Sequence, residues 1–316
     1  MHLPDFLVVG APKAATTALH AALARHPELF MTAVKEPKHF LTDGPPPRTG
    51  GPGDARTYRE HVWRRADYSA LFDGAPPGAL RGESTPFYLY SLEAQRRIHA
   101  AIPHARLIAV LRDPVERAHS NWTHLWSAGL EPIGDVVRAC ADEPRRIAAG
   151  WSPFWHYLQL GRYGEQLRHL FTLFPRDQVL LLRYRDLVDR PTDTLDRICA
   201  FLGVSTGLLT EVPRENVTAH PSPGGRHRLL SLAVRALPPL AIPLEGMLQR
   251  SGRARRPLTW EQRSALIGHF ADDIALLQEV TGQDYGDWLQ PRQRSGGLVG
   301  NRPEGQRQAR NGVRRL

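Results

Sequence analysis

The sequence predicts a three-layer α/β fold, in which a central parallel sheet is flanked by helices. Short apolar stretches suited to buried strands alternate along the chain with amphipathic stretches suited to helices. Two of these strand-to-helix junctions are rich in small, basic and hydroxyl residues. The 316 residues, 41% hydrophobic and 23% charged, suit a globular protein that can bury a sizeable core.

The predicted elements follow one another in alternating order. Ser91 and Asp113 are expected to cap helices, because their side-chain oxygens can accept backbone N–H groups, and Pro27 is expected to follow the end of the first helix. Strands are expected over residues 5–10, 105–111 and 178–184, with a strand end in 79–85; helices are expected from residue 16 towards residue 27 and over 91–102, 114–127, about 192–202 and about 259–279.

One domain is expected over residues 1–291, followed by a basic tail over 292–316. The tail is rich in Arg, Gly, Gln and Asn, so it is predicted to be disordered and solvated. The net charge of +9 and the pI of about 10 favour an anionic partner. Nucleic acid is not the partner we expect, because the tail accounts for part of this charge.

Cysteine usage and hydropathy predict a cytoplasmic protein. Cys140 and Cys199 have no metal-type spacing and could form at most one pair, which suits a reducing compartment. No stretch approaches the ~18 apolar residues of a membrane span, and the first strand begins too early for a signal peptide. Residues 229–248 are expected to form a broken, packed helix, with peripheral membrane contact left open.

The first junction, "GAPKAATT" over residues 10–17, is predicted to bind an anion. A helix N-terminus offers free N–H groups and a positive dipole end, and small residues allow close approach. In the nucleotide motif G-x-x-x-x-G-K-[ST], the lysine comes six residues after the first glycine. Counted from Gly10 that place is Thr16, and Lys13 comes three residues early. A Mg²⁺-nucleotide is therefore disfavoured, although a solvated lysine in an ordinary loop stays open.

The second junction, "LIAVLRDPVERAHSNWTHLW" over residues 107–126, repeats this design. Arg112 ends the strand and is expected to project into the same crevice, where its fork could hold a phosphate. The alternative is a structural ion pair with Asp113 or Glu116. The following helix is expected to have a core face and an opposite polar face, made respectively of Ala118, Trp122, Leu125 and Trp126 and of Arg117, Ser120, Asn121 and His124.

Together, "GAPKAATTAL", "VKEPKHF" and "VLRDPVERAHSNW" resemble motifs of the PAPS-dependent sulfotransferases, where PAPS is 3′-phosphoadenosine 5′-phosphosulfate. The bacterial and glycosaminoglycan branches are the most similar. The resemblance runs from Phe6 to Tyr184, with a weaker echo over 287–289. It implies a P-loop-type fold, and an enzyme that transfers a sulfuryl group from PAPS without a metal.

The resemblance also implies which residues bind the donor. It implies that Arg112 and Ser120, eight residues later, bind the 3′-phosphate. Arg226 and Arg228, in the loop 216–228, are further candidates. The family usually has glycine where this chain has Ala15, which we expect to be tolerated with a negative φ. The residues implied to hold the 5′-phosphosulfate are Pro12, Lys13, Ala14, Ala15, Thr16 and Thr17.

Related glycan sulfotransferases place a catalytic Glu soon after the first loop, which implies that Glu36 is the general base. A partly desolvated carboxylate suits this task. Alternatively, Glu36 merely pairs with the nearby lysines, Lys13, Lys35 and Lys38. His39 is the second candidate base, because imidazole titrates near neutral pH.

The acceptor site is less defined. The segment 82–91 matches a family segment that lines the acceptor cleft, but Ser84 stands where some glycan enzymes have a lysine. Glu83 is interpreted as structural or as part of the site. The aromatic segment 150–163 either walls the acceptor site or packs in the core. A glycan, lipid or small molecule, accepting at a hydroxyl or amine, remains open.

The predicted function is therefore in-line sulfuryl transfer, with Glu36 as base and Lys13 stabilising the leaving group. Two alternatives remain: a P-loop kinase or NTPase, and a non-catalytic protein that binds nucleotides or polyanions. The sequence does not determine the oligomeric state.

Overall fold

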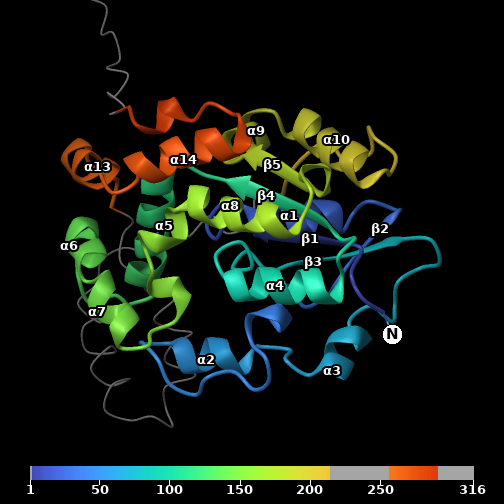
Figure 1. The fold of residues 1–316 in the computed structure, drawn as a ribbon. Coiled ribbons are helices and arrows are strands. Elements are labelled where there is room, and N and C mark those ends of the chain that lie inside the picture. The colour runs from blue at the N-terminus through green and yellow to red at the C-terminus, as the bar shows by residue number, and fades with distance from the viewer. Residues whose placement is uncertain (1, 214–255, 291–316) are drawn as a thin grey trace, which may run out of the picture.

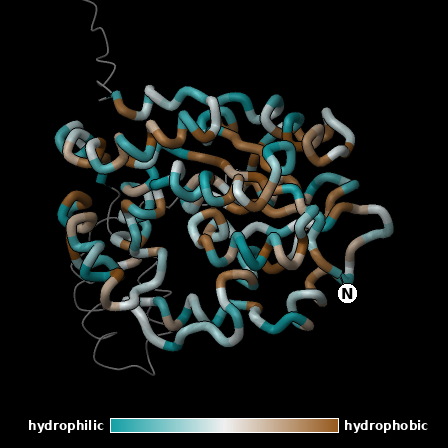
Figure 2. The backbone as a smooth tube through the Cα atoms, in the orientation of Figure 1, coloured by the Kyte–Doolittle hydropathy of each residue, from teal (hydrophilic) through white to brown (hydrophobic). Residues whose placement is uncertain are grey.

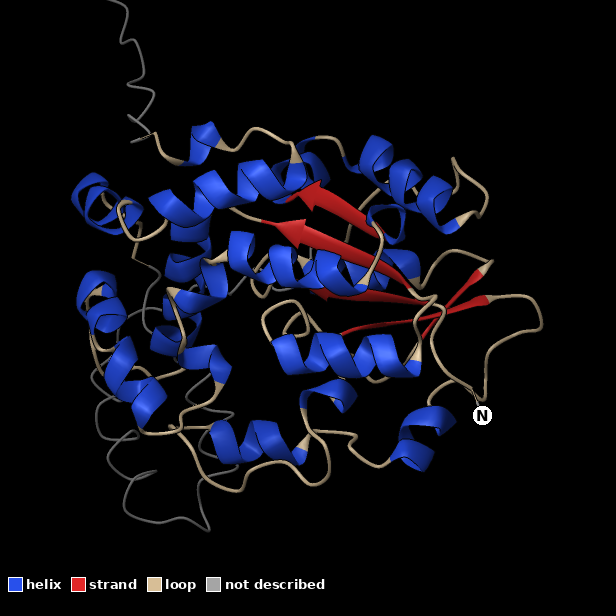
Figure 3. Ribbon diagram, in the orientation of Figure 1, coloured by secondary structure: helices blue, strands red, loops and turns tan. Residues whose placement is uncertain are grey.

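The computed structural model describes residues 2–213 and 256–290. Within them a parallel sheet has the strand order β2-β3-β1-β4-β5, with helices on both sides (Figure 3). This confirms the α/β prediction. The strands are β1 (Phe6–Gly10), β2 (Leu29–Met31), β3 (Leu80–Ser84), β4 (Arg106–Leu111) and β5 (Val179–Arg183). Strand β2 was not predicted, because three residues are too few to show a pattern.

The central strands form the core of the molecule. Every residue of β1 is buried, and the strands are among the most hydrophobic segments of the tube in Figure 2. Burial on both faces is typical of parallel strands covered by helices. Gly82 of β3 lies opposite Phe6, and a Cβ at this position would lie 2.2 Å from the ring. Only glycine therefore allows the ring to pack against the sheet.

The helices predicted from the sequence are present, with one correction. The single helix expected over 259–279 is two helices, α13 and α14, because the chain turns at Gly268 and buries Phe270. The helices are α1 (Thr16–Leu23), α2 (Asp54–Arg59), α3 (Arg65–Ala70), α4 (Leu92–Ala101), α5 (Pro114–Ser127), α6 (Val136–Ala141), α7 (Glu143–Ala148), α8 (Tyr163–Leu173), α9 (Tyr184–Asp189), α10 (Pro191–Leu202), α13 (Trp260–Ile267) and α14 (Ala271–Thr281).

Helix α5 begins and ends where the sequence predicts, and the Asp113 carboxylate caps it by accepting from the next N–H groups. Its predicted polar face is partly covered by another segment of the chain. Arg117 and Asn121 are fully buried, because the segment 153–157 packs over them and its carbonyl groups accept their side-chain N–H groups. Trp126, expected in the core, is only half-buried.

The C-terminal helices pack on the rest of the domain. In Figure 1, α14 lies beside α8 although about 100 residues separate them, and the two helices are in direct contact. The Asp273 carboxylate accepts from the N–H groups of Gly164 and Glu165 at 2.9 and 3.0 Å, so it satisfies the start of α8. Residues 256–290 are therefore an integral part of the packed structure.

Two further predictions can be compared with the described part of the chain. Both cysteines are buried free thiols. None of the helices in residues 2–213 and 256–290 combines the length and apolar character that crossing a membrane requires. The expectations for 229–248, Arg226, Arg228 and the tail 292–316 lie outside the described residues.

Candidate active site

The two junctions meet at the carboxyl edge of the sheet, as predicted. An N–H of the Arg112 side chain donates to the carbonyl of Lys13 at 3.0 Å, joining the ends of β4 and β1. Around them lies a cleft of about 570 Å³, lined by Pro12, Lys13, Ala15, Thr16, Thr17, Ala18, Glu36, Pro86, Phe87, Arg112, His124, Phe154 and Tyr184. Ligands of open α/β sheets bind at this edge.

The loop before α1 forms a concave set of backbone N–H groups. Lys13 and Ala15 both have left-handed conformations, with φ of 69° and 62°, and Ala14 lies between them. The expectation of a negative φ at Ala15 was wrong, because the chain must turn sharply to enter α1. Such left-handed turns gather N–H groups into an anion-binding concavity. The methyl group of Ala15 cannot cap α1, and its first turn holds no acid. The N–H of Ala14 donates to the carbonyl of Ala11 at 3.2 Å, so the N–H groups open to an anion are those of the uncapped first turn of α1.

Lys13 brings a positive charge to this concavity. Burial, followed by the positive charge of Arg112, lowers its pKa from the usual 10.5 to about 8. The side chain is therefore still mainly protonated at neutral pH, although two cations share one small cleft. A bound anion would relieve both the burial cost and this repulsion.

Arg112 is held in the cleft but retains unused hydrogen-bonding capacity. Its guanidinium lies over the ring of Tyr184, 4.6 Å from the centroid. Its Nε is buried without a hydrogen bond and lies 3.6 Å from a carboxylate oxygen of Glu116. Asp113 is not its partner, because that carboxylate pairs with Arg263 at 2.7 Å. Of the two predicted structural pairs, only the long contact to Glu116 exists.

Ser120 and Ala14 do not line the cleft. Ala14 is fully buried beneath the loop. Ser120 is half-buried on α5, one turn before His124, which does line the cleft. Because residues four apart share one face of a helix, Ser120 lies on the same side of α5 as the cleft.

Glu36 faces the same cleft as Lys13. Its N–H donates to the carbonyl of Ser84 at 3.0 Å, which fixes it beside the end of β3. One carboxylate oxygen is paired with Lys35, whereas Lys38 pairs with Glu60 instead. The predicted pairing with neighbouring lysines is thus limited to Lys35.

His39, the second candidate base, does not line the cleft. Its ring stacks on Tyr68 with centroids 4.1 Å apart, and its Nδ1 lies 2.9 Å from the carbonyl of Val62. Burial lowers the pKa of His39, which disfavours the charged ring. The geometry therefore favours Glu36.

Aromatic side chains form one wall of the cleft. Phe87 and His124 contact Phe154 edge-to-face, with centroid distances of 5.9 and 5.4 Å. Phe87 lies in the segment 82–91 that was predicted to line the acceptor cleft. The predicted aromatic segment 150–163 divides between both interpretations, because Phe154 lines the cleft whereas Trp155 is fully buried in the core.

Sequence analysis missed Tyr184 as part of the site. The signal was present, because Tyr184 directly follows β5, and the carboxyl ends of parallel strands share one edge. The guanidinium of Arg112 lies over its ring, so Tyr184 belongs to the part of the cleft that carries Arg112.

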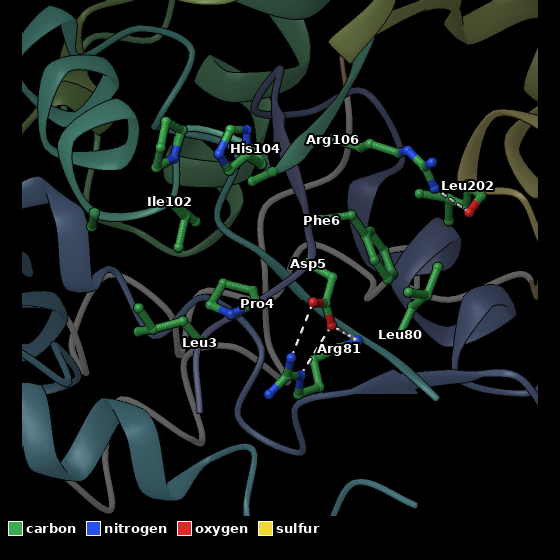
Figure 4. Close-up of a pocket in the computed structure, with 13 residues that line it drawn as sticks. Leu3, Pro4, Asp5, Phe6, Leu80, Arg81, Ile102, His104, Arg106 and Leu202 are labelled. Atoms are coloured by element: carbon green, nitrogen blue, oxygen red, sulfur yellow. Dashed lines mark hydrogen bonds and ion pairs between the residues drawn. The ribbon is translucent and has the colours of Figure 1, made fainter. Parts of the chain in front are cut away.

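A second hollow of about 530 Å³ lies at the opposite, amino edge of the sheet (Figure 4). Its charged groups are satisfied by one another. Arg81 donates to both carboxylate oxygens of Asp5, at 2.9 and 3.0 Å, and Arg106 donates to the carbonyl of Leu202. The two edges therefore differ, since only the carboxyl edge combines a buried cation with unused donors. Within the described residues no cluster of three His, Cys, Asp or Glu could hold a metal ion.

Comparison with known proteins identifies the family. A model of the sulfotransferase family matches residues 4–207, nearly two thirds of the chain. This chain belongs to the sulfotransferase family. The matched residues include both junctions, Glu36 and every residue that lines the cleft.

Individual relatives agree with this assignment. Human heparan sulfate glucosamine 3-O-sulfotransferase 6 is 31% identical over 204 residues, which cover 64% of this chain and 52% of the relative. Human bifunctional heparan sulfate N-deacetylase/N-sulfotransferase 3 is 28% identical over 211 residues, 22% of its length. The chain thus spans about half, or less, of these relatives.

A solved structure covers more of this sulfotransferase-family chain. The sulfotransferase from Alicyclobacillus acidocaldarius is 26% identical, covers 92% of this chain and all of its own, and superposes with a TM-score of 0.75. The shared fold therefore includes regions beyond the family match at residue 207.

Proposed function

We propose that this protein transfers the sulfuryl group of PAPS to a hydroxyl or amine of an acceptor. The observation that carries the proposal is one cleft that combines an anion-binding loop, two cations and a carboxylate. The family relationship supports the donor, because the sulfotransferases that the chain resembles use PAPS. A kinase is less well supported, because the loop lacks the motif lysine and the second glycine.

The donor fits the charges of the cleft. The N–H groups of the loop 12–17, the hydroxyl groups of Thr16 and Thr17, and Lys13 would hold the 5′-phosphosulfate. Arg112 and Ser120 would hold the 3′-phosphate. Arg112 suits this role because its buried Nε has no hydrogen-bond partner, and a phosphate would satisfy it.

The residues of the cleft then divide the chemistry. The acceptor oxygen or nitrogen forms a bond to sulfur while the bond between sulfur and the bridging phosphate oxygen breaks. Glu36 takes the acceptor proton, and Lys35 occupies only one of its oxygens. Lys13 and the start of α1 stabilise the negative charge that develops on the departing phosphate. Fixing both ends of the donor aligns the sulfur for attack.

The sheet order supports one side of the cleft as the acceptor side. Arg112 and Tyr184 follow β4 and β5, on one side of β1, whereas Glu36 and Phe87 lie beside the end of β3, on the other. The aromatic wall is thus on the side of the base. Aromatic faces suit the apolar face of a sugar, a lipid or another small acceptor.

We further propose that residues 1–291 act as one catalytic domain, in the cytoplasm.

The test is transfer of ³⁵S from labelled PAPS to a panel of glycan, lipid and small-molecule acceptors. Lys13→Ala should lower kcat more than it weakens binding of the product nucleotide PAP, whereas Arg112→Ala should chiefly weaken PAP. EDTA should leave the activity intact, and so should deletion of residues 292–316. Full turnover by Lys13→Ala would contradict the mechanism, and loss of activity in EDTA would favour a kinase.

A further inference from the structure

The segment that carries Glu36 has an unfavourable backbone. Glu36 and Lys38 both adopt left-handed conformations, with φ of 61° and 60°. For residues other than glycine, each such conformation costs on the order of 1 kcal/mol or more. We call residues 35–38 the base loop. Its conformation must be imposed by contacts with its surroundings.

Those contacts come mainly from the end of β3. The N–H of Glu36 donates to the carbonyl of Ser84 at 3.0 Å, and the N–H of Lys38 donates to the hydroxyl of Thr85 at 3.3 Å. On the outer side, the N–H of Val62 donates to the carbonyl of Pro37 at 2.8 Å. Of these three hydrogen bonds, only the one to Thr85 uses a side-chain acceptor, so a substitution can remove it without altering the backbone.

The Thr85 hydroxyl is oriented by Glu83. It donates to Glu83 Oε2 at 2.9 Å, and its oxygen accepts from the N–H of Lys38. Glu83 Oε1 accepts from the Tyr68 hydroxyl at 3.2 Å. Thr85 and Glu83 are both fully buried. A chain of hydrogen bonds therefore runs from the Glu83 carboxyl through Thr85 to the base loop.

Glu83 is an expensive residue for a purely structural position. Among the described residues no Lys, Arg or His pairs with it, and burial raises its pKa to about 7. A buried carboxyl without a cation costs stability, and apolar residues of similar size fill a core more favourably. A carboxyl group at this position is explained if its oxygens orient a neighbouring group of the site, as Oε2 does for the Thr85 hydroxyl.

We propose that Glu83 and Thr85 are positioning residues that hold the base loop, and with it Glu36, in the orientation needed for proton transfer. This rests on the proposed role of Glu36 as the base. Neither residue lines the cleft, so they act through the loop rather than on the reactants.

Thr85→Val tests this directly, because it removes the hydroxyl at nearly constant volume. We expect kcat to fall by about tenfold, the effect of one lost positioning hydrogen bond. The Kd for PAP should change by less than about twofold, because the donor loop is separate. Thr85→Ser should recover most of kcat. Tyr68→Phe is the matched control, since it removes a hydrogen bond to the same carboxyl that is not part of the chain to Lys38, and its kcat should stay within about threefold of wild type.

A double-mutant cycle separates positioning from a general structural effect. In a Glu36→Gln background, Thr85→Val should lower the residual rate no further, because the group that it positions is already gone. Glu83→Gln serves as the second perturbation if Thr85→Val is unstable, with the same expected loss of kcat at unchanged PAP affinity. An equal loss in both backgrounds, or no loss from either substitution, would overturn the inference. If the Glu36→Gln variant kept wild-type activity, the proposed role of Glu36 as the base would instead be refuted.

Discussion

Loss of the charge on Lys13 should lower kcat/KM for PAPS above pH 8. Burial, reinforced by Arg112, lowers the pKa of Lys13 to about 8, whereas a solvated lysine stays charged to about 10.5. Only the protonated form can attract the phosphosulfate. With a pKa of about 8, about 90% of Lys13 is protonated at pH 7 and about 10% at pH 9. The second-order rate constant kcat/KM for PAPS should therefore fall about tenfold between these two pH values.

The assay is ³⁵S transfer at limiting PAPS from pH 6.5 to 10, with PAP binding measured by calorimetry over the same range. Lys13→Arg is the control, because its guanidinium remains charged throughout and should abolish the alkaline decline. Substitutions of two residues near Lys13 should shift the midpoint of the pH profile in opposite directions. Arg112→Gln removes a repelling charge and should move the midpoint upward, whereas Glu36→Gln removes an attracting charge and should move it downward. A flat profile to pH 9.5, or the same decline in Lys13→Arg, would refute the reasoning.

Three further predictions concern stability. Ala15→Gly should leave the free energy of unfolding unchanged or raise it by up to about 1 kcal/mol, because glycine relieves the left-handed strain but gives the unfolded chain more freedom. Ala14→Gly is the control and should lower the free energy of unfolding. Urea unfolding measures both. The pKa of Glu83 is raised to about 7, so between pH 4.5 and about 7 the folded state holds a proton that the unfolded state has lost. The stability that this proton contributes is fully present below pH 4.5 and is lost as the pH rises through 7. Relative to Glu83→Gln, wild type should lose about 3 kcal/mol over that range. Gly82→Ala should destabilise by about 1–3 kcal/mol or more through overlap with Phe6, with Gly268→Ala, at an open position, as the control in thermal unfolding.

The sheet and both junctions were predictable from the sequence because they depend on local patterns. Largely apolar strands such as 105–111 and the Asp-Pro start of α5 leave little choice of conformation. Two features depended on tertiary contacts instead. Residues 153–157 cover Arg117 and Asn121, which a helix pattern alone places on the surface. The burial of Phe270 breaks the last helix, although its sequence is compatible with one continuous helix.

The errors at the site have a different physical origin. In the described residues, the non-glycine residues with positive φ are Lys13, Ala15, Glu36 and Lys38. Three of them line the cleft, and the fourth belongs to the base loop. Ala15 shows why sequence reasoning failed here. The local preference of alanine is a negative φ, whereas the sharp turn into α1 requires a positive one. Unfavourable backbone conformations cluster at functional sites, so these residues point to the same cleft independently of any motif. That independence supports the proposed role of Glu36, whose left-handed conformation is held by hydrogen bonds from the end of β3.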